Sequence, residues 1–248
     1  MSDADGMIDP GSAGMAPAWS RSRTEDGAPP AADVVFLLDC DNTLLDNDLV
    51  QQDLRDRLAR EFGPASRDRC WAILEQLRTE LGYVDYLGAL QRYRPENLDD
   101  TGLLLMSSFL VDYPFGDRLY PATLEVIHHR GTLGLTVNLS DGDVVFHPRK
   151  IQRSGLWAAV DGRVLVYVHK ERMLAAVADR YPARHHVIVD DKLRILRMVK
   201  RIWGHRVTAV FPRQGHYTLD PGVLAAFPAA DLTIQRLGDL LAGDVSSC

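Results

Sequence analysis

The chain has few cysteines and no long apolar run, and each absence excludes a class of protein. Its three cysteines, Cys40, Cys70 and Cys248, are scattered and odd in number, which rules out a disulfide framework or a thiolate zinc site. No stretch approaches the ~20 apolar residues that a transmembrane helix needs, and no signal-peptide core is recognisable. We therefore expect a cytoplasmic protein with no membrane partner.

An excess of basic residues is also absent. The 248 residues carry a net charge of −6 at pH 7, which argues against nucleic acid or an anionic membrane as a partner. Neither G-x-x-x-x-G-K nor G-x-G-x-x-G occurs, so a nucleotide-driven motor or a dinucleotide enzyme has no support. None of the eight histidines has the i, i+4 spacing of a helical zinc site.

The first 32 residues are rich in Ala, Gly, Pro, Ser and Asp, with very few β-branched residues. Such a segment cannot bury enough apolar surface to offset the entropy of ordering. We expect residues 1–32 to form a disordered tail.

From residue 33 onward, short apolar runs alternate with helical patterns. Strands that are continuously apolar are buried on both faces, which is typical of a parallel sheet covered by helices. The sequence therefore predicts an α/β fold, a Rossmann-like three-layer core formed by residues 33–43 and 119–243. The expected strands are 34–39, 133–140, 162–168, 185–191, 205–211 and 231–235, and the expected core helices are 121–131, 148–157, 170–182, 192–204 and 236–242.

Residues 44–118 contain no convincing strand. Helical patterns occupy 47–62, 66–80, 83–93 and 100–112. An insertion directly after the first strand is expected to cover the carboxyl end of that strand, where ligands of open α/β sheets bind. We interpret 44–118 as a small α-helical cap.

Two aspartates close the first apolar run, in "FLLDCDNTLLD". Residues i and i+2 of an extended chain point the same way, so Asp39 and Asp41 are expected to face one pocket, with Cys40 turned into the core. Two nearby carboxylates repel unless a cation balances them, and Mg²⁺ prefers such oxygen ligands. An EF-hand is excluded by Leu44 and Val50, whereas a simple βα turn or helix cap stays open on spacing alone.

The chain resembles the haloacid dehalogenase superfamily in four motifs that occur in order, each at the end of an expected strand. The first is the full D-x-D-x-T pattern, and the others are "LGLTVNLSDG", "YVHKERM" and "HVIVDDK". The resemblance implies the phosphatase branch, with a C1-type helical cap. Its motif residues here are Asp39, Asp41, Thr43, Ser140, Lys170, Asp190 and Asp191.

This resemblance implies catalytic roles for the paired aspartates. Asp39 would be the nucleophile that forms an aspartyl-phosphate, and Asp41 the general acid and base. Mg²⁺ would be held by Asp39, the main-chain carbonyl of Asp41 and Asp191, with Asp190 as a further ligand through water or as an orienting partner.

The second and third motifs imply the phosphate-binding residues. Ser140, with the backbone N–H groups of Asp141 and Gly142, would hold phosphoryl oxygens, and Lys170 would add a positive charge. Gly142 would let the backbone approach the phosphate closely.

The position of Asp41 favours one reaction type. A departing halide is a stable anion and needs no proton, whereas an alkoxide leaving group does. We therefore expect a phosphohydrolase acting on a small-molecule phosphate ester. A phosphomutase, a 2-haloacid dehalogenase and a non-catalytic family member remain the alternatives.

Departures from the family pattern leave some assignments open. Many members have a further acid where this chain has Ile195, and Lys170 is followed by Glu171 rather than Pro. Arg149 and Lys150 could touch a substrate, but we interpret them as part of a solvated helix face. In the cap, five residues are candidates for substrate contact that are more often core edge or surface: Arg78, Tyr83, Tyr86, Arg92 and Tyr93.

Overall fold

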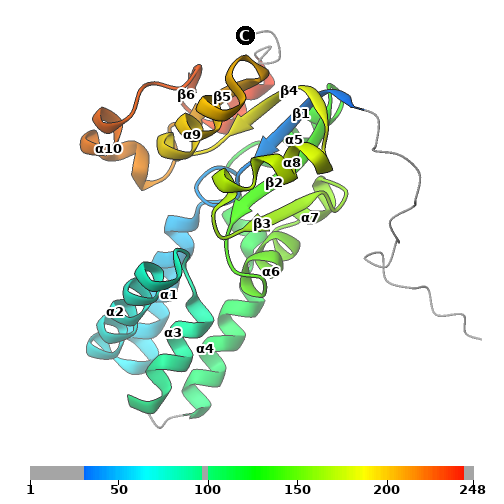
Figure 1. Ribbon diagram of the computed structural model, residues 1–248. Coiled ribbons are helices and arrows are strands. Elements are labelled where there is room, and N and C mark those ends of the chain that lie inside the picture. Colours follow the sequence, from blue (N-terminus) through cyan, green and yellow to red (C-terminus); the bar gives the residue numbers. More distant parts are fainter. Residues whose placement is uncertain (1–30, 97–99, 243–248) are drawn as a thin grey trace, which may run out of the picture.

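The computed structural model describes residues 31–96 and 100–242 and shows a six-stranded parallel sheet, which confirms the predicted α/β core (Figure 1). The strand order is β3-β2-β1-β4-β5-β6, so β1 lies between β2 and β4. The strands are β1 (Ala32–Leu38), β2 (Leu135–Asp141), β3 (Val164–Tyr167), β4 (Ala183–Val189), β5 (Val207–Pro212) and β6 (Leu232–Ile234).

The first strand begins slightly earlier than predicted. Ala32 already belongs to β1, in register with Ala183 of β4. The predicted tail therefore extends too far by at least this residue. The rest of that prediction, residues 1–30, lies outside the described residues, as does residue 243 at the predicted end of the core.

Helices cover both faces of the sheet, as the three-layer prediction requires. Along β1, Val35 and Leu37 point into one apolar cluster, and Phe36 and Leu38 point into the other. One face is covered by α8 (Leu174–Arg180) and α9 (Leu193–Trp203), with α10 (Pro221–Ala226) near its edge; the other by α5 (Thr123–Gly131), α6 (Phe146–Arg153) and α7 (Leu156–Ala159). The helix expected at 236–242 is instead a 3₁₀ turn, Leu237–Leu241.

Four helices follow β1 in the order that the sequence predicts. Asp46 and Asp85 cap two of them with their side chains, and Pro64 begins another at the position where a missing N–H costs nothing. None of the described helices is long and apolar enough to cross a membrane. The four are α1 (Asn47–Phe62), α2 (Pro64–Leu81), α3 (Tyr86–Tyr93) and α4 (Asp100–Asp112).

The two ends of this helical segment lie side by side and are hydrogen-bonded to each other. Leu45 forms an antiparallel bridge with Leu119, and the N–H of Tyr120 donates to the carbonyl of Leu44 over 3.0 Å. The division into core and cap at residues 44 and 118 stays a prediction, and these contacts between the two ends of the segment support it.

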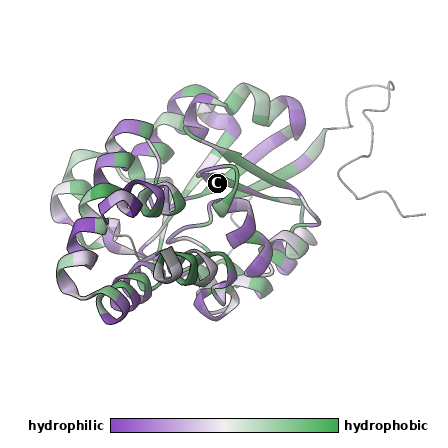
Figure 2. Cartoon of the chain, turned by 90° about the horizontal axis from the view of Figure 1, so that it is seen from below, coloured by the Kyte–Doolittle hydropathy of each residue, from purple (hydrophilic) through white to green (hydrophobic). Residues whose placement is uncertain are grey.

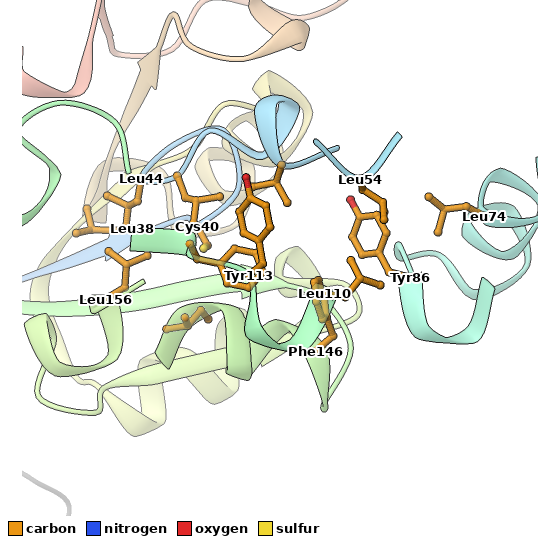
Figure 3. Packing of buried hydrophobic residues seen from close by; sticks show 14 of the residues in the cluster. Leu38, Cys40, Leu44, Leu54, Leu74, Tyr86, Leu110, Tyr113, Phe146 and Leu156 are labelled. Carbon is orange, nitrogen blue, oxygen red and sulfur yellow. The ribbon is translucent and has the colours of Figure 1, made fainter. Parts of the chain in front are cut away.

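The helical segment and the sheet share one apolar cluster. The ring of Tyr86 in α3 meets Phe146 of α6 edge-on at 5.3 Å, and Phe115 lies 5.8 Å from Phe146. Figure 3 shows Tyr86 and Phe146 in this cluster, with Leu38 of the sheet on one side and Leu54 and Leu74 of the cap helices on the other. Cys40 is fully buried in the same cluster, as its position between two aspartates predicts. In Figure 2 the strands are largely hydrophobic, whereas the helices carry both kinds of residue.

Candidate active site

The sheet order brings the predicted motif residues together. Asp39 directly follows β1, Ser140 lies at the end of β2, and Asp190 follows β4. Because β2 and β4 flank β1 and all three are parallel, their carboxyl ends meet at one edge. Lys170, in the 3₁₀ turn Lys170–Arg172 after β3, reaches the same place.

Three buried carboxylates form a possible metal centre there. Asp39, Asp190 and Asp191 are at most 2% exposed, and one carboxylate oxygen from each lies within 4.8 Å of the others. Within the described chain, Asp39 Oδ2 and both oxygens of Asp191 have no hydrogen-bond partner. Burial raises the pKa of Asp191 well above its ordinary value, and the charges of Asp190 and Asp39 add to this. Lys170 and Lys192 balance only part of the charge of the three carboxylates, and hard oxygen ligands with excess negative charge fit a Mg²⁺ ion.

Asp190 and Asp191 differ in the contacts that their carboxylate oxygens already make. Asp190 Oδ2 lies 2.7 Å from Lys170 Nζ, and Asp190 Oδ1 accepts the N–H of Lys192 over 2.8 Å. The Asp191 N–H donates to Thr43 Oγ1 over 3.1 Å, but its carboxylate oxygens accept nothing from the residues that the structure describes. This difference favours Asp191 as the direct metal ligand and Asp190 as the partner that orients Lys170.

Lys170 is enclosed by acceptors. Its ammonium donates to Asp39 Oδ1 and to the carbonyl of Leu139, and pairs with Asp190. Burial alone would lower the pKa of Lys170, but the two carboxylates raise it above its ordinary value. The Lys170 N–H donates to Asp141 Oδ1 over 2.7 Å, so the Asp141 side chain fixes the turn that carries the lysine.

The phosphate-binding prediction needs one correction. Ser140 Oγ lies 3.2 Å from Asp39 Oδ1, next to the residue that the sequence predicts to be the nucleophile. The N–H of Gly142, however, donates to the carbonyl of Tyr167 over 2.8 Å and is not available to a phosphate. Glycine is needed here for another reason, because a Cβ would lie 2.4 Å from Cγ of the His147 ring.

Lys150 does not lie on a solvated helix face, so that interpretation was wrong. Its side chain is 1% exposed, and its Nζ lies 2.7 and 2.8 Å from the two carboxylate oxygens of Asp41. It also donates to Asn47 Oδ1 over 2.9 Å. Arg149, by contrast, is 43% exposed on the side chain, as predicted.

These contacts determine the ionisation of Asp41. Burial opposes ionisation, but the Lys150 ammonium outweighs it and lowers the pKa of Asp41 below its ordinary value. His147 lies beside this pair, with Nε2 at 2.9 Å from Ser140 Oγ, and burial lowers its pKa to about 4. Asp41 is therefore a carboxylate and His147 is neutral. The Asp41 side chain lies outside the three-carboxylate cluster.

A cavity of about 330 Å³ opens beside Asp41 and Asp191, between α6, α9 and the cap. Of the five cap candidates, Arg78, Tyr83 and Tyr86 line it. Arg92 instead pairs with Glu80, and Tyr93 is buried in the core. The lining also includes Lys192 and Arg194 from the core, and Arg78 donates to the hydroxyl of Tyr217 over 2.8 Å.

The residues that sequence reasoning missed or misassigned come mainly from α6. His147, Lys150 and Ile151 form a buried stripe on this short helix together with Phe146. That helical spacing is a weak signal in the sequence, because two of its four members are polar and would ordinarily be assigned to solvent. Asn47, at the start of α1, carried no signal at all.

No family model and no curated protein matches the chain, but solved structures do. A crystal structure from Burkholderia xenovorans, assigned to the haloacid dehalogenase-like hydrolases, is 63% identical and superimposes with a TM-score of 0.81. The match covers 86% of this chain and 99% of that one. The chain belongs to the haloacid dehalogenase-like hydrolases.

More distant structures with this fold are assigned to different reactions. An L-2-haloacid dehalogenase is 18% identical with a TM-score of 0.58, covering 85% of this chain and 97% of its own. A structure from Thermotoga maritima that is assigned as a β-phosphoglucomutase is 15% identical with a TM-score of 0.54, covering 85% of this chain and 97% of its own. At these identities the likeness shows the fold alone, so the reaction of this hydrolase has to come from its own site.

Proposed function

We propose that the protein is a Mg²⁺-dependent phosphohydrolase that acts on a small phosphorylated metabolite through an aspartyl-phosphate on Asp39. The observation that carries this proposal is the placement of two carboxylates with separate partners. Asp39 lies in the cluster of three carboxylates and accepts from Lys170. Asp41 lies beside this cluster and is paired with Lys150.

Asp39 has one oxygen held and one free. Oδ1 accepts from Lys170 and Ser140, whereas Oδ2 has no hydrogen-bond partner among the described residues. Oδ2 attacks the phosphorus, and the bond from phosphorus to the leaving oxygen breaks. The positive charge of Lys170 stabilises the phosphoryl oxygens, and the Ser140 hydroxyl turns from Asp39 Oδ1 to donate to one of them while the charge shifts. We also assign the backbone N–H of Asp141 to the phosphate.

Asp41 serves both proton transfers. An approaching phosphate dianion raises the pKa of a neighbouring carboxyl, so Asp41 takes up a proton as substrate binds and gives it to the leaving oxygen. It is then a carboxylate again, the form that Lys150 stabilises in the resting site. In this form it removes a proton from the water that hydrolyses the aspartyl-phosphate.

Asp39, Asp191 and the main-chain carbonyl of Asp41 would hold the Mg²⁺ ion, with Asp190 as the orienting partner. When bound, the ion supplies positive charge against the carboxylates and the phosphate. The cavity of about 330 Å³ suits a small substrate. Sugar phosphates, nucleoside monophosphates and phosphoglycolate-like acids are the substrate classes to test. A cytoplasmic location stays a prediction.

A panel of phosphorylated metabolites, assayed with and without Mg²⁺, tests the proposal. We expect phosphate release that requires the metal and falls by at least about 10³-fold in Asp39→Asn. Asp33→Asn is the matched control, because Asp33 lies at the opposite end of β1 and its side chain is 82% exposed. Equal turnover by Asp39→Asn would remove Asp39 as the nucleophile.

Two further assays separate the alternatives. A phosphosugar that yields an isomer without free phosphate would indicate a phosphomutase, and halide release from a 2-haloacid would indicate a dehalogenase. Asp41 argues against the dehalogenase, because an acid at this position serves an alkoxide leaving group and a departing halide needs no proton. A phosphomutase uses the same two aspartates, so the products distinguish it from a hydrolase.

A further inference from the structure

The Lys150 ammonium donates all of its hydrogen bonds to two residues. An ammonium group has three N–H donors. The three short contacts of Nζ are to Asp41 Oδ1, Asp41 Oδ2 and Asn47 Oδ1, at 2.7, 2.8 and 2.9 Å. Because both oxygens of Asp41 are engaged by one group, rotation of this carboxylate is restricted.

The surroundings of Lys150 leave it little freedom to move. Its Nζ lies 5.7 Å from the centre of the Phe146 ring, and that ring meets Tyr86 of the cap. A buried ammonium in an apolar setting needs its ion pair, since losing the partner leaves an uncompensated charge. The position of Lys150 is therefore tied to that of Asp41.

The third contact joins this pair to the cap. Asn47 is the first residue of α1, and its N–H donates to Asn42 Oδ1 over 3.0 Å. Asn42 follows Asp41 in the loop after β1, so the first residue of α1 is linked to the Asp41 carboxylate through Lys150 and to the neighbouring loop residue directly. Lys150, on a core helix, bridges the acid and the cap.

We propose that Lys150 is a positioning residue for the phosphoryl-transfer reaction, which holds the Asp41 carboxylate in the orientation for proton transfer and links it to the cap through Asn47. This inference rests on the proposed function. Lys150 itself does not touch the phosphorus or the leaving group.

An aryl phosphate separates this role from a merely structural one. With 4-nitrophenyl phosphate, Asp39 Oδ2 forms a bond to phosphorus, and nitrophenolate departs with the electron pair of the broken bond. Nitrophenolate is a stable anion and needs no proton from Asp41. In the second step water attacks phosphorus, Asp41 takes the proton, and the bond to Asp39 breaks. A misplaced Asp41 therefore slows the second step and spares the first.

The test follows nitrophenolate release in the first turnover and in the steady state, for wild type and Lys150→Met with Mg²⁺. We expect Lys150→Met to release about one nitrophenolate per enzyme at a rate within about threefold of wild type. Its steady-state rate should then be about 10- to 100-fold lower, the loss expected when a catalytic group is displaced.

Two variants serve as controls. Arg153→Met removes another cation of α6 that contacts the cap, through the carbonyl of Asp112 at 2.8 Å, and should behave like wild type. Asn47→Ala loosens only the third contact of Lys150 and should give the same pattern with a smaller loss. Because it leaves the buried ion pair intact, it keeps the test valid if Lys150→Met folds poorly.

A double variant tests whether Lys150 acts through Asp41. Lys150→Met combined with Asp41→Asn should be no slower than Asp41→Asn alone, since the group to be positioned is already lost. Lys150→Arg should recover part of the steady-state rate.

Three outcomes would overturn the inference: a first turnover and steady state that fall in proportion, an unchanged steady state, or multiplicative losses in the double variant. A wild type without Mg²⁺-dependent nitrophenolate release would instead overturn the proposed function, and the inference with it.

Discussion

Two buried lysines hold the two aspartates of the loop after β1, and they do so in different ways. Lys170 and Lys150 are each 1% exposed on the side chain. Lys170 pairs with Asp39 and Asp190, and Lys192 lies 3.9 Å from Asp191, so two cations face three clustered carboxylates and the cluster stays negative. Lys150 pairs with one carboxylate, Asp41, and their charges cancel.

This difference in charge balance assigns different tasks to the two places. An excess of buried negative charge favours binding of a metal ion, and the bound ion can then attract a phosphate. A carboxylate whose charge is balanced by one lysine is suited to accepting and returning a proton. Asp41 can do this because its side chain is 25% exposed toward the cavity, whereas that of Asp39 is 2% exposed.

The largest effect that separates the two lysines is expected from Lys170→Met. Lys170 donates to Asp39, the proposed nucleophile, so its loss should lower steady-state phosphate release by about 10³-fold or more. Lys150→Met should cost 10- to 100-fold by comparison. Both are measured per folded enzyme, with folding checked by thermal unfolding. Losses of equal size, or a smaller loss for Lys170→Met, would contradict the contrast.

The sequence predicted the first lysine and not the second, for a physical reason. Lys170 follows a strand in a parallel sheet, and parallel strands place their carboxyl ends at one edge whatever the details of packing. The direction of Lys150 depends on how α6 packs against the cap, through Phe146 and Tyr86. One sequence does not specify that tertiary contact.

The same distinction explains the other successes and failures. Continuous apolar runs predicted the strands, and helical patterns predicted the four cap helices to within a few residues. The hydrogen bond of the Gly142 N–H to Tyr167 was missed because it depends on how far β2 and β3 pair.

A smaller effect concerns His147, which is neutral and lies beside Ser140 and the Asp41–Lys150 pair. Its pKa of about 4 lies below the unfolded value of about 6.5, so the unfolded chain binds more protons between these pH values. The stabilising contribution is fully present above about pH 6.5 and is lost as the pH falls toward 4. We expect the free energy of unfolding to fall by about 3 kcal/mol over this window from this residue.

Denaturant unfolding at several pH values, with EDTA present, measures this loss. Other groups also titrate there, including the partly buried His186, whose pKa burial lowers as well. His147→Gln isolates the effect, because it removes the ring and keeps a polar side chain near Ser140. If the pH dependence of the variant matches that of the wild type, His147 is not the group responsible.

The smallest expected effect tests which aspartates bind the metal. Saturating Mg²⁺ should raise the melting temperature of the wild type by about 5 °C, because the ion binds only the folded carboxylate cluster. Asp191→Asn should abolish most of this rise, since both oxygens of Asp191 are without hydrogen-bond partners in the described structure. Asp41→Asn should keep it, because only its main-chain carbonyl would contact the ion.

This last pair separates the two lysine sites without any assay of activity. If the two sites differ in charge balance as described, Mg²⁺ binds the carboxylate cluster around Lys170 and does not bind the Asp41–Lys150 pair. If Asp41→Asn lost the Mg²⁺-dependent rise while Asp191→Asn kept it, the metal would belong with Asp41. Lys150 would then compete with the ion for that carboxylate, and the assignment of tasks to the two sites would have to be reversed.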